Sequence, residues 1–292
     1  FDSSRVDAAQ AHLGATEGTS SWAMTAPPAK RRCIMGGIAL ELPADDDASR
    51  DGCEDVTGFE LWQPATTAAC GALLADRSLV QKRLVLELGC GLGALGVLCG
   101  HLGAAGVLLT DREPAVLRRA VRTAELNGVG ARCDFVAVNF ARGNSPWRTG
   151  VFDLAVASDV LFLDRLARPL FGAMEALHHD SDRGAAVASS VCTKRAPCER
   201  PLAGVLGHEL RQAVYRGPDG KPCLEPDDSA LEEFLRLAGP HARHSVPRDK
   251  TGASTPADVA GGPQTDENGA LATPPGPKAI AVLLHWPAWP TT

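Results

Sequence analysis

The stretch RLVLELGCGLGALGVLCGHLGAAGVLLTD, from Arg83 to Asp111, decides the fold of this chain. A short apolar run at 84–88 leads into three closely spaced glycines, leucines follow at helical spacing, and a second apolar run ends at Asp111. This order predicts a strand, a tight turn, a helix and a second strand. Glycines let the backbone turn sharply and approach a ligand, and the amides at the start of a helix face polar oxygens.

The carboxylate that ends this stretch indicates the kind of ligand. In nucleotide-binding α/β folds, a carboxylate at the end of the second strand accepts hydrogen bonds from the ribose hydroxyls, and Asp111 has this position. We therefore interpret the stretch as a nucleoside site. Its further candidate residues are Glu87, Gly89, Cys90, Gly91 and Gly93.

Two other interpretations of the same stretch were weighed. The run from Leu88 to Thr110 contains no charged side chain and is long enough for a membrane span. Its seven glycines and the central His101 disfavour this interpretation. Gly89-x-Gly91-x-x-Ala94 also fits the nicotinamide dinucleotide fingerprint. Glu87, two residues before the first glycine, and the segments further along the chain favour a different nucleoside ligand. We predict no membrane insertion.

Length and composition predict one large α/β domain with appendages. The chain has 292 residues, of which 45% are apolar, enough for a substantial core. Residues 1–32 are rich in small and polar residues at their start and predict a flexible N-terminal extension. We assign 33–292 to the domain, with a low-complexity insert at about 249–278.

The net charge and the cysteine content indicate which binding partners and which cellular compartment to expect. The net charge of −6 provides no overall positive field for nucleic acid or an anionic membrane, and suits a basic protein substrate better. The nine cysteines include no C-x-x-C pair, so neither a disulfide framework nor a zinc site is indicated. The acidic cluster at 45–55 lacks the spacing of a calcium loop, and we predict no metal. We expect reduced thiols in the cytoplasm, with the nucleus as an alternative, and a chain that is a fragment without a secretory signal.

The remaining pattern predicts alternating helices and strands. A helix begins at Pro114 and stops at Asn127-Gly128, and a second runs over 163–179. Ser229-Ala-Leu-Glu232 has the capping-box pattern for a third helix, which Gly239-Pro240 ends. Strands are predicted at 133–138, 152–158, 185–191 and 279–285, the segment 33–42 is partly strand-like, and 202–215 stays open between helix and strand.

Four side chains lie at positions suited to a ligand. Trp62 precedes a small-residue helix, where its indole would cover a bound adenosyl group, and Phe140 follows the strand at 133–138. Asp159 and Phe162 follow the next strand at i and i+3, so they face a cleft together if the chain turns helical there. A core role for either ring and a helix-capping role for Asp159 remain open alternatives.

With these pieces placed, the chain resembles the class I S-adenosylmethionine-dependent methyltransferases, and among them the family 16 protein-lysine methyltransferases. The resemblance covers roughly residues 58–162. The stretches that carry it are Leu61-Trp62-Gln63-Pro64-Ala65, Leu86-Glu87-Leu88-Gly89-Cys90-Gly91-Leu92-Gly93, Leu109-Thr110-Asp111 with Asn127, and Ala157-Ser158-Asp159-Val160-Leu161-Phe162. The last contains the Asp-x-x-Phe tetrad that is characteristic of that group.

The resemblance implies a fold and a cofactor. The fold is a Rossmann-like, doubly wound α/β structure with a mostly parallel seven-stranded sheet and a final antiparallel strand. The cofactor is S-adenosylmethionine, and the residues implied to contact it are Trp62, the backbone at Gly89, Cys90 and Gly91, the carboxylate of Asp111, and Ser158. Relatives often have Asp-Trp where this chain has Asn139-Phe140, and the insert before the last strand has no recognised counterpart.

The resemblance also implies an activity, methylation of a lysine on a non-histone protein. Our hypothesis is that Asp159 captures and orients the incoming amine, Phe162 lines the channel, and the proton goes to water. We expect a protein substrate, no nucleic acid, no membrane and a monomer.

Other functions were also considered. Asn144-Ser145-Pro146-Trp147 resembles the motif with which nucleic-acid amino-methyltransferases hold an amine, but it lies before the strand at 152–158 and not after it. The acidic net charge disfavours nucleic acid as well. A small-molecule methyltransferase and a non-catalytic cofactor-binding or scaffold protein stay open, because this fold does not fix the acceptor.

Overall fold

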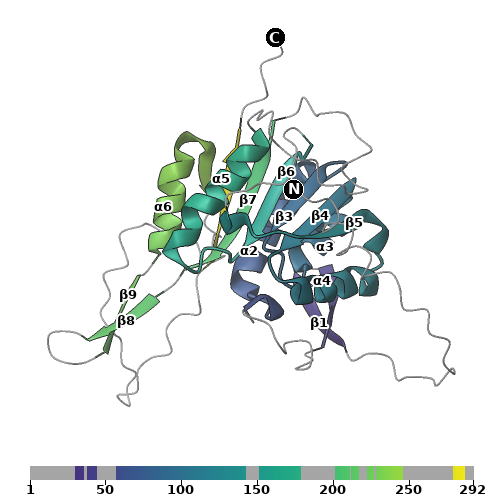
Figure 1. Ribbon diagram of the computed structural model, residues 1–292, viewed down its shortest axis with the longest axis horizontal. Helices are drawn as coiled ribbons and strands as arrows, with labels where there is room; N and C mark the ends of the chain where they lie inside the picture. Colours follow the sequence, from purple (N-terminus) through teal and green to yellow (C-terminus); the bar gives the residue numbers. More distant parts are fainter. Residues whose placement is uncertain are drawn as a thin grey trace, which may run out of the picture.

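The protein folds around one twisted sheet with helices on both sides (Figure 1). The computed structural model describes residues 30–35, 38–44, 57–142, 151–178, 201–210, 212–216, 222–226, 228–245 and 279–286. Among these residues, no helix has the length and apolar character that a membrane crossing requires.

The central sheet has seven strands in the order β10-β11-β7-β6-β3-β4-β5. Their bounds are β3 Leu84–Leu88, β4 Gly106–Asp111, β5 Cys133–Ala137, β6 Leu154–Ser158, β7 Ala203–Glu209, β10 Ala242–Ser245 and β11 Ala279–His285. Neighbouring strands from β5 to β7 pair in parallel, whereas β11 pairs antiparallel with both β7 and β10. The predicted fold class is confirmed, including the final antiparallel strand.

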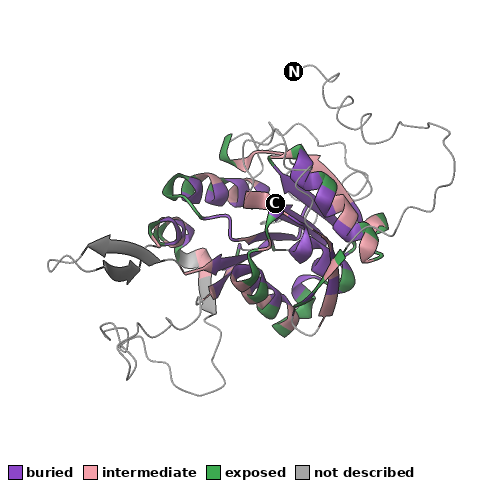
Figure 2. Ribbon diagram, turned by 90° about the horizontal axis from the view of Figure 1, so that it is seen from below, coloured by how far each residue is buried: buried purple, intermediate pink, exposed green. Residues whose placement is uncertain are grey.

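The five α-helices of the described residues divide between the two faces of the sheet (Figure 1). They are α2 Gln63–Ala75, α3 Ala94–His101, α4 Pro114–Leu126, α5 Ala167–His178 and α6 Ser229–Ala238. One core joins the sheet to α2, α3 and α4, and a second joins it to α5 and α6. In Figure 2 the buried residues lie in the sheet and along the inner sides of the helices.

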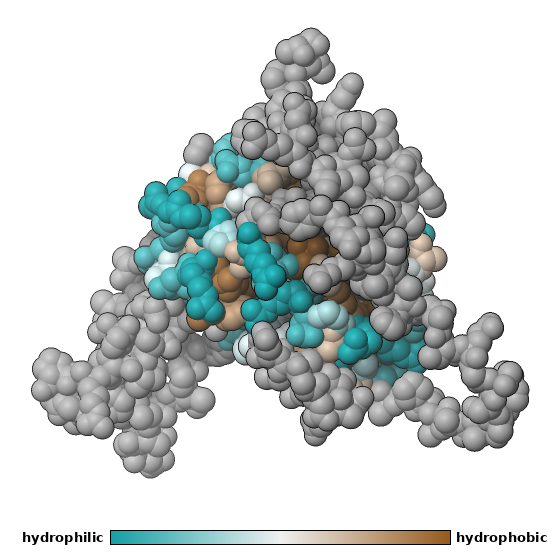
Figure 3. Space-filling model, in the orientation of Figure 1, coloured by the Kyte–Doolittle hydropathy of each residue, from teal (hydrophilic) through white to brown (hydrophobic). Residues whose placement is uncertain are grey.

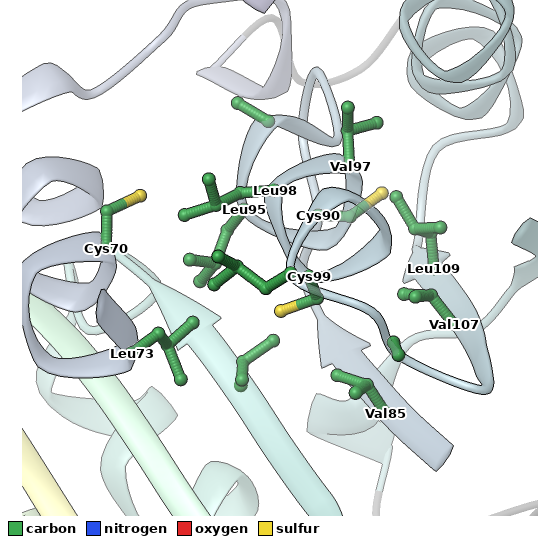
Figure 4. Close-up of a cluster of buried hydrophobic side chains, with 14 of the residues drawn as sticks. Cys70, Leu73, Val85, Cys90, Leu95, Val97, Leu98, Cys99, Val107 and Leu109 are labelled. Carbon is green, nitrogen blue, oxygen red and sulfur yellow. The ribbon is translucent and has the colours of Figure 1, made fainter. Parts of the chain in front are cut away.

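The alternation of side chains along the central strands fills both cores. Val85 of β3 and Val107 of β4 face α3, while Leu86 and Leu108 face the other side, toward α5 and α6. Figure 4 shows Leu95 and other side chains of α3 packed among side chains of α2, β3 and β4. The uncharged run from 88 to 110 is therefore the buried centre of the domain, with a helix of eight residues inside it.

A β-hairpin packs against α4 and α3. Strands β1 Lys30–Met35 and β2 Ile38–Pro43 pair antiparallel, and β1 begins three residues before the predicted domain start. Asn127 fastens the hairpin to the helix: its Oδ1 accepts from the Glu41 N–H at 3.0 Å, and its Nδ2 donates to the Glu41 carbonyl at 2.7 Å. Nδ2 also donates to the Thr123 carbonyl at 2.7 Å. Asn127 thus joins the hairpin to the helix as well as ending α4.

We expect Asn127→Ala to lower the free energy of unfolding by about 2 kcal/mol, because it leaves partly buried backbone groups of β2 and α4 without their partner. Chemical denaturation measures this change. The control is Arg122→Ala on the same helix, which removes only an exposed ion pair with Glu125 and should cost under about 1 kcal/mol. Equal effects of the two substitutions would contradict the assigned role.

One local prediction stays untested and one needs correction. The strand predicted at 185–191 lies outside the described residues, and the parallel strand beside β6 is β7, in the segment left open between helix and strand. Asp228, and not Ser229, is the N-cap residue of α6, because the Ser229 hydroxyl donates to the Asp164 carboxylate at 2.6 Å instead. The chain between β7 and α6 forms a separate hairpin of β8 Gln212–Arg216 and β9 Pro222–Pro226, which projects from the body of the domain in Figure 1.

Several further predictions fall on residues that the structure does not describe. These are the extension up to residue 29, the acidic cluster at 45–55, the segment 144–147, and the insert at 249–278. Among the described residues, no group of three or more histidine, cysteine, aspartate or glutamate side chains is arranged to hold a metal ion.

Candidate functional site

A cleft of about 320 Å³ opens at the carboxyl ends of β3, β4 and β6. This is the edge at which open α/β sheets bind their ligands. The cleft is lined by ten of the predicted site residues: Trp62, Glu87, Gly89, Cys90, Gly91, Asp111, Phe140, Ser158, Asp159 and Phe162. Residues separated by up to 100 positions in the sequence are therefore brought to one place.

The glycine turn after β3 forms the floor of the cleft. Gly89 and Gly91 have positive φ angles of 66° and 52°, a conformation that residues with a Cβ rarely adopt. A Cβ on Gly89 would also lie 2.7 Å from Cγ1 of Val160, so glycine here lets the segment after β6 approach the turn. This packing places the residues that follow β6 against the glycine turn.

Gly93 is the exception among the predicted site residues. It does not line the cleft, and a Cβ there would lie 2.9 Å from Leu109 and 3.0 Å from Ala120. Gly93 precedes α3 as its N-cap residue. Its lack of a side chain therefore serves close packing of α3 against β4 and α4, the role of the third glycine in dinucleotide-binding turns.

The carboxylate of Asp111 joins the glycine turn to the end of β4. One of its oxygens accepts from the Gly91 N–H at 3.0 Å and the other from the Glu113 N–H at 3.1 Å. Burial raises the pKa of Asp111 above its usual value, and these two N–H groups oppose that rise by favouring the charged form. The backbone N–H of Arg112 also favours the charged form. A carboxylate has about four acceptor positions, so it can still accept from a ligand hydroxyl.

Glu87 is buried below the first turn of α3. Its Oε2 accepts from the Gly96 N–H at 2.9 Å, and only 1% of the residue is exposed. Burial raises the pKa of the carboxyl group to about 8. Although Glu87 lines the cleft, its side chain is thus engaged with the helix that supports the glycine turn.

Residues of α2 close another side of the cleft. Trp62 precedes the helix, is 40% exposed, and donates from its indole N–H to the Thr57 carbonyl at 3.1 Å. Thr66, one turn further on, lies 2.8 Å from the Ser158 hydroxyl at the end of β6. Sequence reasoning missed Thr66, because a hydroxyl within a small-residue helix carries no signal of a partner 92 positions away.

Asp159 has an unusual backbone for a residue with a side chain. Its φ angle is 51°, and its N–H donates to the Gly207 carbonyl of β7 at 2.9 Å. The side chain is 5% exposed, and its Oδ1 accepts from the Glu209 N–H at 3.5 Å. Strained backbone at a residue of this kind is concentrated at functional sites. The neighbouring strand therefore holds the carboxylate at the cleft, and α5 begins only at Ala167, eight residues later.

Two aromatic rings line the cleft near Asp159. Phe162 is 38% exposed, and Phe140, at the start of a short 3-10 helix (η5, Phe140–Arg142), is partly buried. Phe140 packs against the core below α5, while one edge of its ring comes within 3.7 Å of the position that a Cβ on Gly89 would take. The ring therefore serves core packing and also lines the cleft, and its contact with an adenine stays a prediction.

Comparison with known proteins identifies the family. The family model described as lysine methyltransferase, from methyltransferase family 16, matches residues 48–197, just over half of the chain. The chain belongs to this lysine methyltransferase family. Its place is thus among the class I S-adenosylmethionine-dependent methyltransferases, and S-adenosylmethionine is the cofactor of this family member.

Curated relatives and solved structures were also compared with this family member. The chain is 34% identical to a ribosomal protein L11 methyltransferase of Methylococcus capsulatus over 196 residues, which are 67% of this chain and 57% of the relative. It is 42% identical to one from Synechococcus over 106 residues, 36% and 35% of the two chains. The chain thus spans little more than half of the length of the first relative and about a third of the length of the second. Among solved structures, an S-adenosylmethionine-dependent methyltransferase from Mesorhizobium loti aligns at 18% identity and a TM-score of 0.43, covering 75% of this chain and 98% of that one.

The residues at the cleft fit the cofactor. The carboxylate of Asp111, the glycine turn and the exposed indole of Trp62 line one continuous space. These groups suit a ribose, a polar amino acid tail and a flat purine, respectively. The individual contacts remain predictions of this arrangement.

We expect Asp111→Asn to weaken binding of S-adenosylmethionine about tenfold or more, because an amide loses the charge-assisted acceptors for the ribose hydroxyls. Isothermal calorimetry on the folded variant measures the dissociation constant. Asp134→Asn, at the amino end of the neighbouring β5, removes the same charge away from the cleft and serves as the control. Unchanged affinity in the Asp111 variant would show that the sugar binds elsewhere.

Proposed function

We propose that this chain transfers a methyl group from S-adenosylmethionine to the ε-amine of a lysine on a non-histone protein. The observation that carries the proposal is that Asp159 and Phe162 line the same cleft as the glycine turn and Asp111. The family match supports lysine as the acceptor, and the relatives' named substrate, ribosomal protein L11, supports a protein. Five cysteines of the described residues are free and buried, which suits the cytoplasmic location expected from the sequence.

For this reaction the protein mainly has to align the amine with the methyl–sulfur bond and to exclude water. When bound, the cofactor supplies a methyl group that its sulfonium already makes electrophilic. A lysine ammonium has no lone pair and must lose a proton before nitrogen forms the new bond to carbon. The groups of the cleft therefore have to bring the amine into line and hold it there, which is where most of the rate gain arises.

Asp159 has the position for this task. Its carboxylate lies at the cleft, is nearly buried, and is fixed by β7 through backbone bonds on both sides of His208. A buried carboxylate attracts an incoming ammonium more strongly than an exposed one does. We propose that Asp159 captures and orients the amine, that the exposed ring of Phe162 lines the channel and excludes water, and that the proton goes to solvent.

Labelling with methyl-radiolabelled S-adenosylmethionine in a cell lysate tests the proposal. Labelled protein bands whose hydrolysates contain methyl-lysine are the expected result. Labelled extractable metabolites would show a small-molecule methyltransferase, and the absence of label despite cofactor binding would show a non-catalytic cofactor-binding protein. Either of these outcomes overturns the proposed activity and leaves the family assignment in place.

A further inference from the structure

A second cleft adjoins the cofactor cleft and carries positive charge. It is lined by Arg112, Asn139, Ala141, Arg142, Phe162, Leu163, Arg165 and Leu166. Phe162 and four other residues line both clefts, so the two spaces are continuous at the residue that the proposed function places at the lysine channel. A polypeptide that delivers a lysine past Phe162 can therefore place its neighbouring residues over this second cleft.

The three arginines reach this place from three separate elements. Arg112 directly follows β4, Arg142 ends η5, and Arg165 lies in the 3-10 helix η6 (Asp164–Leu166). All three are exposed. Within the described part of the chain, no acidic residue contributes to the lining of this cleft. Three arginines thus gather in one cleft of a chain whose net charge is −6.

Apolar side chains accompany the arginines. Phe162 and Leu163 are 38% and 39% exposed, although both are large and hydrophobic. Figure 3 shows that hydrophilic and apolar residues also lie side by side on the face of the molecule that it presents. Arginine forms forked hydrogen bonds with carboxylates, and exposed rings and leucines bury the stems and apolar side chains of a bound peptide.

We infer that this arginine cleft, defined by Arg112, Arg142 and Arg165, selects substrates that carry acidic residues beside the target lysine. The inference rests on the proposed function and deepens it by naming the substrate class. An acidic segment is favoured over a nucleic acid because the overall negative charge opposes a long polyanion, whereas three arginines beside apolar side chains match a short peptide. The acidic composition of the whole chain indicated a basic substrate. The positive charge of this cleft instead favours acidic residues on the substrate beside the target lysine.

Paired peptides test the inference. One peptide has glutamates on both sides of a single lysine, and its partner has glutamines at the same positions. The wild-type protein should methylate the glutamate peptide with a kcat/KM about tenfold higher, and added salt should reduce the difference because the charges are exposed. The Arg142→Glu/Arg165→Glu double variant should lose or reverse this preference.

Two controls keep the result specific. Arg77→Glu makes the same charge change on an exposed arginine before β3, at the opposite edge of the sheet, and should retain the preference. Arg142 and Arg165 do not line the cofactor cleft, so the double variant should bind S-adenosylmethionine with wild-type affinity by calorimetry, which also shows that it is folded.

The outcomes separate the inference from the proposed function. Equal rates on the two peptides, or a preference that survives in the double variant, overturns the inference and leaves lysine methylation standing. If lysate proteins are labelled but neither peptide is, the methylated lysines in those proteins are mapped. Acidic residues beside these lysines would support the inference, and their absence would overturn it. Tight binding of single-stranded RNA that depends on Arg142 and Arg165 would assign the cleft to phosphates instead. If no lysine is labelled anywhere while the cofactor binds, the proposed function fails and the inference falls with it.

Discussion

Asp159→Asn should lower kcat for lysine methylation about a hundredfold while the affinity for S-adenosylmethionine stays unchanged. Asparagine has nearly the same shape and tolerates the positive φ angle of 51° at this position, so the backbone bonds to β7 should persist. What is lost is the negative charge that captures the ammonium. The KM for the protein substrate should rise at the same time, because ground-state binding of the amine uses the same charge.

Steady-state kinetics on a labelled substrate and calorimetry with the cofactor measure the two quantities separately. Asp164→Asn is the matched control, because it removes the same charge five positions away at a residue that does not line the cleft. Its hydrogen bond from Ser229 can be kept by the asparagine oxygen. A variant at Asp159 that turns over at the wild-type rate would remove this residue from the site, whatever the substrate is.

Glu87→Gln should stabilise the protein increasingly as the pH rises from about 5 to 8. The pKa of Glu87 is raised by burial from 4.5 to about 8, so in this window the folded protein holds a proton that the unfolded chain has released. The free energy of unfolding of the wild type therefore falls with rising pH, at about 1.4 kcal/mol per pH unit for this one group. The total effect is several kcal/mol, a large part of the stability of a domain.

Glutamine removes this dependence because it stays neutral at every pH and can still accept from the Gly96 N–H. Urea denaturation of both proteins at several pH values gives the difference in free energy, in which the contributions of all other groups cancel. Glu125→Gln, an exposed carboxylate paired with Arg122, should show no such trend. Parallel stability curves for wild type and Glu87→Gln would mean that Glu87 ionises normally in the folded state.

The predictions for Asp159→Asn and Glu87→Gln concern residues on two sides of the same glycine turn. Glu87 supports it from below through α3, and Val160, next to Asp159, packs on Gly89 from above. Loss of the Glu87 proton is therefore expected to loosen the turn, whereas loss of the Asp159 charge leaves it intact. Stability and turnover should thus respond to different substitutions within one cleft.

The sequence by itself determined the strand-turn-helix-strand unit and placed the glycine turn and Asp111 at the cleft that the structure shows. These follow from local rules: the glycines and Asp111 lie within one βαβ unit, whose geometry is nearly fixed, and parallel strands bring their carboxyl ends to one edge. Family resemblance added the cofactor class, Ser158 and the Asp-x-x-Phe tetrad, and the family match confirmed the resemblance itself.

Only the tertiary structure decided which distant groups meet. The bond between Thr66 and Ser158, the fastening of Glu41 by Asn127, and the hold of β7 on Asp159 join segments whose separation along the chain carries no periodic signal. The arginine cleft is the clearest case, because Arg112, Arg142 and Arg165 are ordinary surface residues until three separate chain segments end beside one another. A local pattern fixes backbone geometry over a few residues, whereas a binding surface depends on the packing of the whole sheet.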